Sequence, residues 1–204
     1  MVQVIRRFAS REVDIETLRP YMQRGFPWHN PKCENPPMLS ASDWWDARLP
    51  VFEEALAGCG FPPEQARSLA RKVRSVYTDT AEWRLYEDTK DVLTELGTEG
   101  WKHAILSNHV PELPCLIDGL GLSSLIHRTI NSAETGFEKP NPLAFQAALA
   151  ALDYPSQVWM IGDNVNADVM GAESVGLRAI LVRGQDPRAA RCASGLRDVR
   201  KFIG

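Results

Sequence analysis

The chain has 204 residues, of which 44% are hydrophobic and 24% are charged, an ordinary composition for a globular protein. Its formal net charge of −3 gives no basic excess that would follow nucleic-acid phosphates or an anionic membrane surface, so neither is expected as a partner. The four cysteines form no C-x-x-C pair, which argues against a zinc knuckle or a dithiol redox site. The sequence shows neither a secretory signal nor a membrane-spanning run, so the expected location is the cytoplasm.

Residues 1–82 have an almost entirely helical pattern. Three amphipathic stretches are expected to be helices: residues 11–24, 42–57 and 64–77. Ser42 is the candidate cap of the second of these. The short run Val2–Ile5 is the one strand candidate in this part of the sequence. Segment 25–40 contains four prolines, which predicts a loop long enough to suspect a function.

From Trp83 onward, short apolar runs alternate with segments of helical length. The predicted strands are residues 103–106, 127–130, 158–161 and 178–182. The predicted helices between and after them are residues 89–99, 112–119, 142–152 and 166–175. This alternation predicts an α/β fold, with a parallel sheet between two layers of helices. Ligands of such sheets bind beyond the carboxyl ends of the strands, so the residues after each strand are the candidates for chemistry.

Polar side chains follow three of the predicted strands. Ser107 and Asn108 follow the first and could bond a phosphoryl oxygen, although such a pair is also ordinary turn and cap chemistry. Lys139 lies between the second and third strands, just before a helix, and could neutralise charge on a phosphoryl oxygen. Alone, a lysine before a proline is more typical of a solvated loop. Asp163 and Asp168 follow the third strand, where their oxygens would suit Mg²⁺. Alternatively, Asp163 or Asn164 caps the following helix and Asp168 favours its dipole.

The order of these motifs along one predicted sheet resembles the haloacid dehalogenase-like superfamily. Ile105-Leu106-Ser107-Asn108 resembles its second motif, Lys139-Pro140 its third, and Gly162-Asp163 through Asp168 its fourth. The resemblance covers about residues 83–190. It implies a parallel, Rossmann-like three-layer core in residues 83–204, preceded by an N-terminal helical cap domain in residues 1–82.

The resemblance also implies a first strand that ends in D-x-D-x-T or D-x-D-x-V, whose first aspartate attacks phosphorus. No such string occurs in the sequence. Asp14-Ile15-Glu16-Thr17 comes nearest, but it is better interpreted as the start of a cap helix. If Val2–Ile5 formed the first strand, Arg6 would replace the nucleophile and the site would be dead. The preferred interpretation is that residues 1–24 already belong to the cap and that the strand lies upstream of Met1.

If the nucleophile is supplied, the resemblance implies Mg²⁺-dependent hydrolysis of a phosphate monoester through an aspartyl-phosphate. Asp163 and Asp168 would bind the metal, Ser107 and Asn108 would hold the phosphoryl group, and Lys139 would bind it and balance its charge. The expected substrate is a small phosphorylated metabolite. The alternative is a catalytically silent member that binds a phosphorylated ligand or a protein partner.

Substrate identity would be set by the cap, its loop and one residue of the core. The candidates in the cap and loop are Trp28, His29, Trp44 and Trp45, and the candidate in the core is His109. Paired tryptophans on a helix usually pack in a core, so most of these aromatic residues are expected to be structural. A homodimer, formed cap to cap or by strand exchange, is compatible with the sequence.

Overall fold

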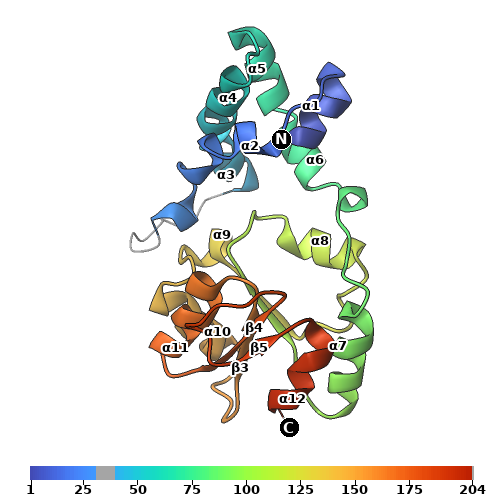
Figure 1. Cartoon of the computed structure of the whole chain (residues 1–204), viewed down its shortest axis with the longest axis vertical. Coiled ribbons are helices and arrows are strands. Elements are labelled where there is room, and N and C mark those ends of the chain that lie inside the picture. Colours follow the sequence, from blue (N-terminus) through green and yellow to red (C-terminus); the bar gives the residue numbers. More distant parts are fainter. Residues whose placement is uncertain (31–39, 204) are drawn as a thin grey trace. The chain divides into compact units, whose positions relative to one another are not determined.

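The computed structural model describes residues 1–30 and 40–203, which form two compact units (Figure 1). Unit 1 contains the described residues up to Arg84, and unit 2 contains those from Leu85 onward. Within the described ranges, no helix combines the length and the apolar character needed to cross a membrane. Most of the loop predicted for residues 25–40 lies outside the described residues.

Unit 1 is helical throughout its described part. Its helices are α1 (Val2–Ala9), α2 (Ile15–Leu18), α3 (Ala41–Asp46), α4 (Leu49–Gly58), α5 (Pro63–Ala70) and α6 (Val73–Tyr77), with short 3-10 turns η1 (Tyr21–Gln23), η2 (Pro27–His29) and η3 (Thr80–Glu82). The stretch predicted as one helix over residues 42–57 is two helices, because Pro50 lacks an N–H and is placed in the first turn of α4. Ser42 was the wrong cap: Ser40 accepts the N–H of Asp43 at 3.2 Å.

The run Val2–Ile5 belongs to helix α1, so its prediction as a strand was wrong. Val4 and Ile5 are completely buried, while the two arginines that follow are exposed. Burial of one helix face overrides the strand preference of these β-branched residues. The account in which Arg6 replaces a nucleophile at a strand end is therefore excluded, and the preferred placement of Arg6 on a helix face is confirmed. Asp14 caps α2, as predicted for the start of a helix.

Unit 2 begins with helix α7 (Thr89–Thr98) and alternates strands with helices. Its strands are β1 (Ala104–Ser107), β2 (Arg128–Asn131), β3 (Trp159–Gly162), β4 (Arg178–Val182) and β5 (Cys192–Ala193). Its other helices are α8 (Leu113–Gly119), α9 (Ser132–Thr135), α10 (Pro142–Ala151), the π-helix η4 (Val165–Met170), α11 (Gly171–Ser174), the 3-10 turn η5 (Leu196–Val199) and α12 (Arg200–Ile203). The four predicted strands are all present, displaced by at most one residue.

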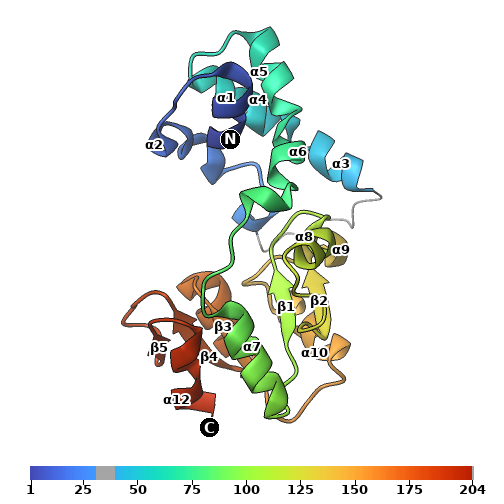
Figure 2. The ribbon, with the colours of Figure 1, turned by 90° about the vertical axis from the view of Figure 1, so that its right-hand side faces the viewer.

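The strands of unit 2 form two separate parallel sheets (Figure 2). β1 pairs with β2, with Ala104 opposite Arg128 and Ser107 opposite Asn131. The second sheet has the order β3-β4-β5. Among the described residues, β1 and β3 are each paired on one side only. The parallel Rossmann-like α/β core is confirmed, but its sheet is interrupted between β1 and β3.

Both sheets are covered by the same helical layers. On one face, Leu106 of β1 and Met160 of β3 pack against a single cluster built by Phe145, Val169, Ala172, Ala179 and Leu181. On the other face of β3, Trp159 and Ile161 pack against the cluster that includes Val92 and Leu96 of α7. The interior residues of β4 are buried, whereas every residue of β3 keeps part of its surface exposed. The two free strand edges therefore lie within one core and not at its rim.

Candidate active site

The loop before α10 carries Lys139 and is held against the end of β1. Asn108 follows β1 and makes two hydrogen bonds to the main chain of Lys139, 31 residues away. Its Oδ1 accepts the Lys139 N–H at 2.7 Å, and its Nδ2 donates to the Lys139 carbonyl at 2.9 Å. The peptide bond between Lys139 and Pro140 is cis. Asn108 thus fixes the main chain from which the Lys139 ammonium extends.

The ammonium of Lys139 binds the carboxylate of Asp168. Nζ donates to Oδ1 at 2.7 Å, and the two side chains are only 11% and 6% exposed. Removing one partner of such a buried pair leaves an uncompensated charge, which makes the pair a strong positional constraint. It joins the Lys139 loop, which Asn108 holds at the end of β1, to the helix that follows β3.

The turn after β3 aims Asp168 back toward the strand. Oδ2 of Asp168 accepts the N–H of Asn164 at 3.0 Å, and Asn164 Oδ1 accepts the N–H groups of Asn166 and Ala167 at 3.0 and 2.9 Å. These bonds open the π-helix η4, a type of turn that is frequent at functional sites. Asn164 therefore acts as the helix cap, as one of the two interpretations of this motif proposed.

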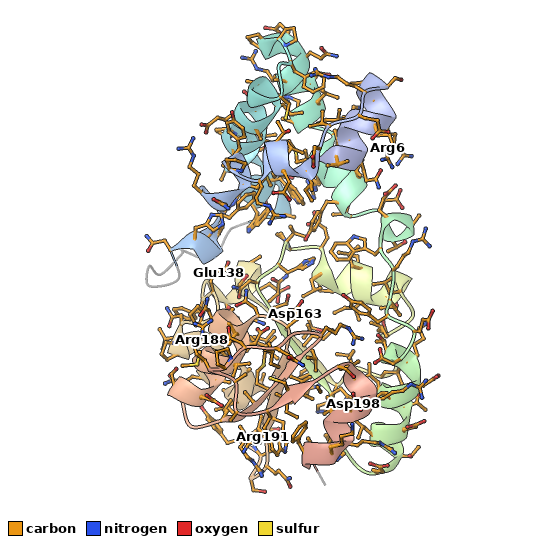
Figure 3. The ribbon with its side chains drawn as sticks, viewed as in Figure 1. Arg6, Glu138, Asp163, Arg188, Arg191 and Asp198 are labelled. Carbon is orange, nitrogen blue, oxygen red and sulfur yellow. The ribbon has the colours of Figure 1, made fainter. Side chains whose placement is uncertain are left out.

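Asp163 stands directly after β3 and is exposed. Its carboxylate makes no hydrogen bond or ion pair with the described residues, in contrast to both oxygens of Asp168. Figure 3 shows Asp163 at the same end of unit 2 as Glu138, the neighbour of Lys139. Asp163 is thus the carboxylate best placed to bind an external group.

Ser107 ends β1 and is partly exposed at the same edge of the sheet. His109 is held nearby, because its N–H donates to the hydroxyl of Ser132 at 3.1 Å. Burial lowers the pKa of the His109 imidazole, against smaller opposing effects of the Val110 main chain and Glu112. This effect favours a neutral imidazole at neutral pH.

Sequence reasoning missed two residues that organise the end of β2. Asn131 is completely buried, caps α9 through the N–H of Ala133 and donates to the Val110 carbonyl at 2.7 Å. The hydroxyl of Ser132 accepts a hydrogen bond from the main-chain N–H of His109. Their signal was present, since both residues come directly after the predicted strand 127–130, at the carboxyl edge of the predicted sheet.

The aromatic candidates for substrate binding fall in unit 1. Trp44 and Trp45 are 2% and 5% exposed, and their ring centroids are 5.1 Å apart. The ring of His29 lies edge-on to Phe26 at 5.6 Å. Burial of the two tryptophans agrees with the expectation that they are structural. The side chain of Trp28 lies outside the described part of the structure.

The site suits a divalent cation only in part. No group of three or more His, Cys, Asp or Glu side chains in the described residues could hold a metal ion. Mg²⁺ is commonly held by one or two carboxylates, with water and substrate phosphate as the remaining ligands. The free carboxylate of Asp163 fits that pattern. Both oxygens of Asp168 already accept hydrogen bonds, from Lys139 and from the Asn164 N–H, so Asp163 is the less committed of the two carboxylates.

Comparison with known protein families shows to which family the chain belongs. A family model described as haloacid dehalogenase-like hydrolase matches residues 7–176. The chain belongs to the haloacid dehalogenase-like hydrolases.

Two relatives and one solved structure illustrate the range of this hydrolase family. The chain is 36% identical over 162 residues to a phosphoserine phosphatase of Thermus thermophilus, covering 76% of this chain and 64% of the relative. It is 31% identical over 151 residues to the human haloacid dehalogenase-like hydrolase domain-containing protein 3, covering 72% of this chain and 58% of that protein. The chain thus spans less than two thirds of the length of either relative.

The solved structure has low sequence identity to this chain, so it supports only the fold. It is the HAD-hydrolase YfnB of Bacillus subtilis bound to magnesium, with a TM-score of 0.73 and 16% identity, covering 98% of this chain and 88% of that one.

Proposed function

We propose that the chain is the larger part of a Mg²⁺-dependent hydrolase of small phosphate monoesters. The observation that carries this proposal is the position of the Lys139 ammonium, 2.7 Å from Asp168 and fixed by Asn108 between the ends of β1 and β3. A positive charge held at that edge suits a phosphoryl group. The name of the Thermus phosphatase, which is 36% identical to this chain over 162 residues, supports the same chemistry.

The nucleophile in this proposal is a carboxylate on a strand between β1 and β3, from a segment outside the 204 residues. Both edges are free of partners among the described residues, and both strands end at the Lys139 loop. A strand placed there would pair on both sides and be buried on both faces, so it should be a continuous apolar run. The first residue beyond it would emerge next to Lys139.

In the proposed reaction, this carboxylate attacks phosphorus and the substrate alkoxide leaves, forming an aspartyl-phosphate that water then hydrolyses. Lys139 neutralises charge on the nucleophile and the phosphoryl oxygens, and Ser107 bonds one of those oxygens. Asn108 contributes by positioning Lys139, and Asp168 by orienting its ammonium. Asp163 would hold Mg²⁺, which would neutralise the phosphoryl oxygens when bound.

The test begins with the DNA upstream of Met1, read for an in-frame apolar run ending in D-x-D-x-T or D-x-D-x-V. Protein extended by that run should hydrolyse p-nitrophenyl phosphate with Mg²⁺ and lose activity in EDTA, while the 204-residue chain should be inactive. Asp163→Asn should lower kcat/KM at least about 100-fold, by analogy with the loss of one electrostatic group at a catalytic site. Asp153→Asn, in the connection between α10 and β3, is the control.

A catalytically silent role is the second candidate. It is favoured because no strand of the described residues ends in a nucleophile aspartate. It predicts that the protein binds phosphate or Mg²⁺ without turnover. If protein verified to contain the added carboxylates hydrolyses no phosphate monoester, the phosphatase proposal is wrong. Hydrolysis of a 2-haloacid without Mg²⁺ would instead favour a dehalogenase, which leaves Asp163 with no evident task.

A further inference from the structure

An open surface pocket, called the cavity below, lies in unit 2 at the opposite end of β1 from the candidate active site. Its volume is about 450 Å³, within the range of about 300–1,000 Å³ typical of small-molecule sites. Three segments line it: part of α7, the connection 101–103 before β1 and the connection 124–127 before β2. The four residues of β1 separate it from Ser107 by roughly 13 Å at about 3.3 Å per residue.

The cavity combines an apolar wall with positive charge. Leu93, Leu125 and Ile126 are partly buried and belong to the packing around α8. Lys102 and His127 line the same space, and none of the lining residues is acidic. This absence is notable in a chain with a net charge of −3.

The acidic side chains of α7 are directed elsewhere. Asp91 pairs with Arg197 at 3.2 Å, and both Glu95 and Glu99 pair with Arg200. They bind the C-terminal elements η5 and α12 and do not line the cavity. The cavity side of α7 presents neutral residues, so the charge of Lys102 is left uncompensated by this helix.

One histidine of the cavity has a fixed ring. His103 Nε2 lies 2.8 Å from the carbonyl of Leu93, so Nε2 carries the hydrogen and donates it. The side of α7 beside this ring is open, because a Cβ built on Gly97 would meet no atom closer than 4.0 Å, the Nε2 of His103.

We propose that this cavity binds a small organic anion with an apolar body, such as an aromatic or branched aliphatic carboxylate, sulfonate or phosphate. The apolar part packs against Leu93, Leu125 and Ile126, and the anionic group pairs with Lys102 and accepts a hydrogen bond from His127. The site is independent of the proposed phosphatase reaction, so its test does not require turnover.

The test is an NMR titration of the full 204-residue chain labelled with ¹⁵N. The probe is naphthalene-2-sulfonate, and 2-naphthylmethanol serves as a neutral probe with the same ring system. The sulfonate should shift the amide signals of residues 93–103 and 124–127 and bind at least about 10-fold more tightly than the alcohol, a ratio that corresponds to about 1.4 kcal/mol.

Two variants test the location. Gly97→Leu fills the cavity while improving helix propensity, so it should abolish binding without lowering stability. Lys102→Gln combined with His127→Gln should weaken sulfonate binding at least about 10-fold and leave the alcohol unchanged. Lys90→Gln, on the same helix but outside the lining, is the control and should bind normally.

Three results would overturn the proposal. One is the absence of sulfonate binding at millimolar concentration. Another is a set of shifts confined to the free edges of β1 and β3, which would place the probe between the two sheets. The third is unchanged affinity in Gly97→Leu, which would show that the cavity is not the binding site.

Discussion

At the candidate active site, Asp168 holds the Lys139 ammonium and the Asn164 N–H at the same time. This double contact requires space beside β3, and Gly162 provides it. A Cβ built on Gly162 would overlap the Asp168 carboxylate. The glycine is therefore needed for the close approach of the Asp168 side chain.

Replacing Gly162 by alanine should displace Asp168 and weaken its bond to Lys139. We expect unfolding free energy to fall by about 1–3 kcal/mol, the usual cost of overfilling a packed site. Urea denaturation followed by circular dichroism measures this loss. Gly184→Ala is the control, because its Cβ would meet neighbouring atoms only at 3.8 Å or more. Equal stability of the two variants would contradict the role assigned to Gly162.

The sequence motifs identified most residues of the candidate site, but they did not predict the contacts that these residues make. Asn108 was predicted to hold a phosphoryl oxygen, whereas in the structure both polar atoms of its side chain bind the main chain of Lys139. That contact joins residues 31 positions apart and forms only when the loop folds back against β1. No local pattern in either segment encodes it.

At the scale of elements, Asp88 joins three parts of unit 2. It precedes α7, and its carboxylate binds Arg183 after β4 at 2.6 Å and the Leu196 N–H of η5 at 2.7 Å. The guanidinium of Arg183 also covers the ring of Tyr86 at 3.7 Å. Desolvation tends to raise the pKa of Asp88, but the bonds from Arg183 and Leu196 outweigh it and place the pKa below its ordinary value.

Asp88→Asn should therefore destabilise the protein in a pH-dependent way. Because the pKa of Asp88 is lower in the folded chain, its contribution is present above the unfolded pKa of about 3.9 and is lost as the pH falls through the folded value. We expect a cost of about 2 kcal/mol at pH 7, in the range for hydrogen bonds to charged groups, shrinking toward zero in acid. Urea denaturation between pH 2 and pH 7 measures it.

Asp91→Asn is the matched control on the same helix. Asp91 pairs with Arg197 at 3.2 Å, but both side chains are 64% exposed, so the change should have little effect at any pH. A loss of stability in Asp88→Asn that does not vary with pH would mean that packing, and not charge, explains the contribution of Asp88.

The sequence predicted the long elements better than the short ones. Strand β4 was placed correctly because Ala179 to Val182 form a continuous apolar run between turn signals. Strand β5 and helix α9 were missed, since two and four residues are too few to show a period. In unit 1, helical periodicity was recognised, but local breaks such as the one before α4 were not.

At the scale of the whole molecule, the interruption between β1 and β3 is the dominant feature of unit 2. The edges of β1 and β3 that face this interruption have no strand partner among the described residues. They agree with the additional strand proposed for this position. Free edges inside a core are also sites of self-association.

Hydrogen exchange should reveal this interruption in the 204-residue chain. β4 is paired on both sides and its interior residues are buried, so its amides should exchange more slowly than those of β1 and β3, by about 10-fold or more for a difference of 1.4 kcal/mol in local opening. Mass spectrometry at two protein concentrations measures this difference. Protection of β1 and β3 that rises with concentration would show that a second molecule covers the edges. Equal, concentration-independent protection of all three strands would contradict the interruption, whereas selective protection of β1 and β3 in the extended protein would support a strand inserted between them.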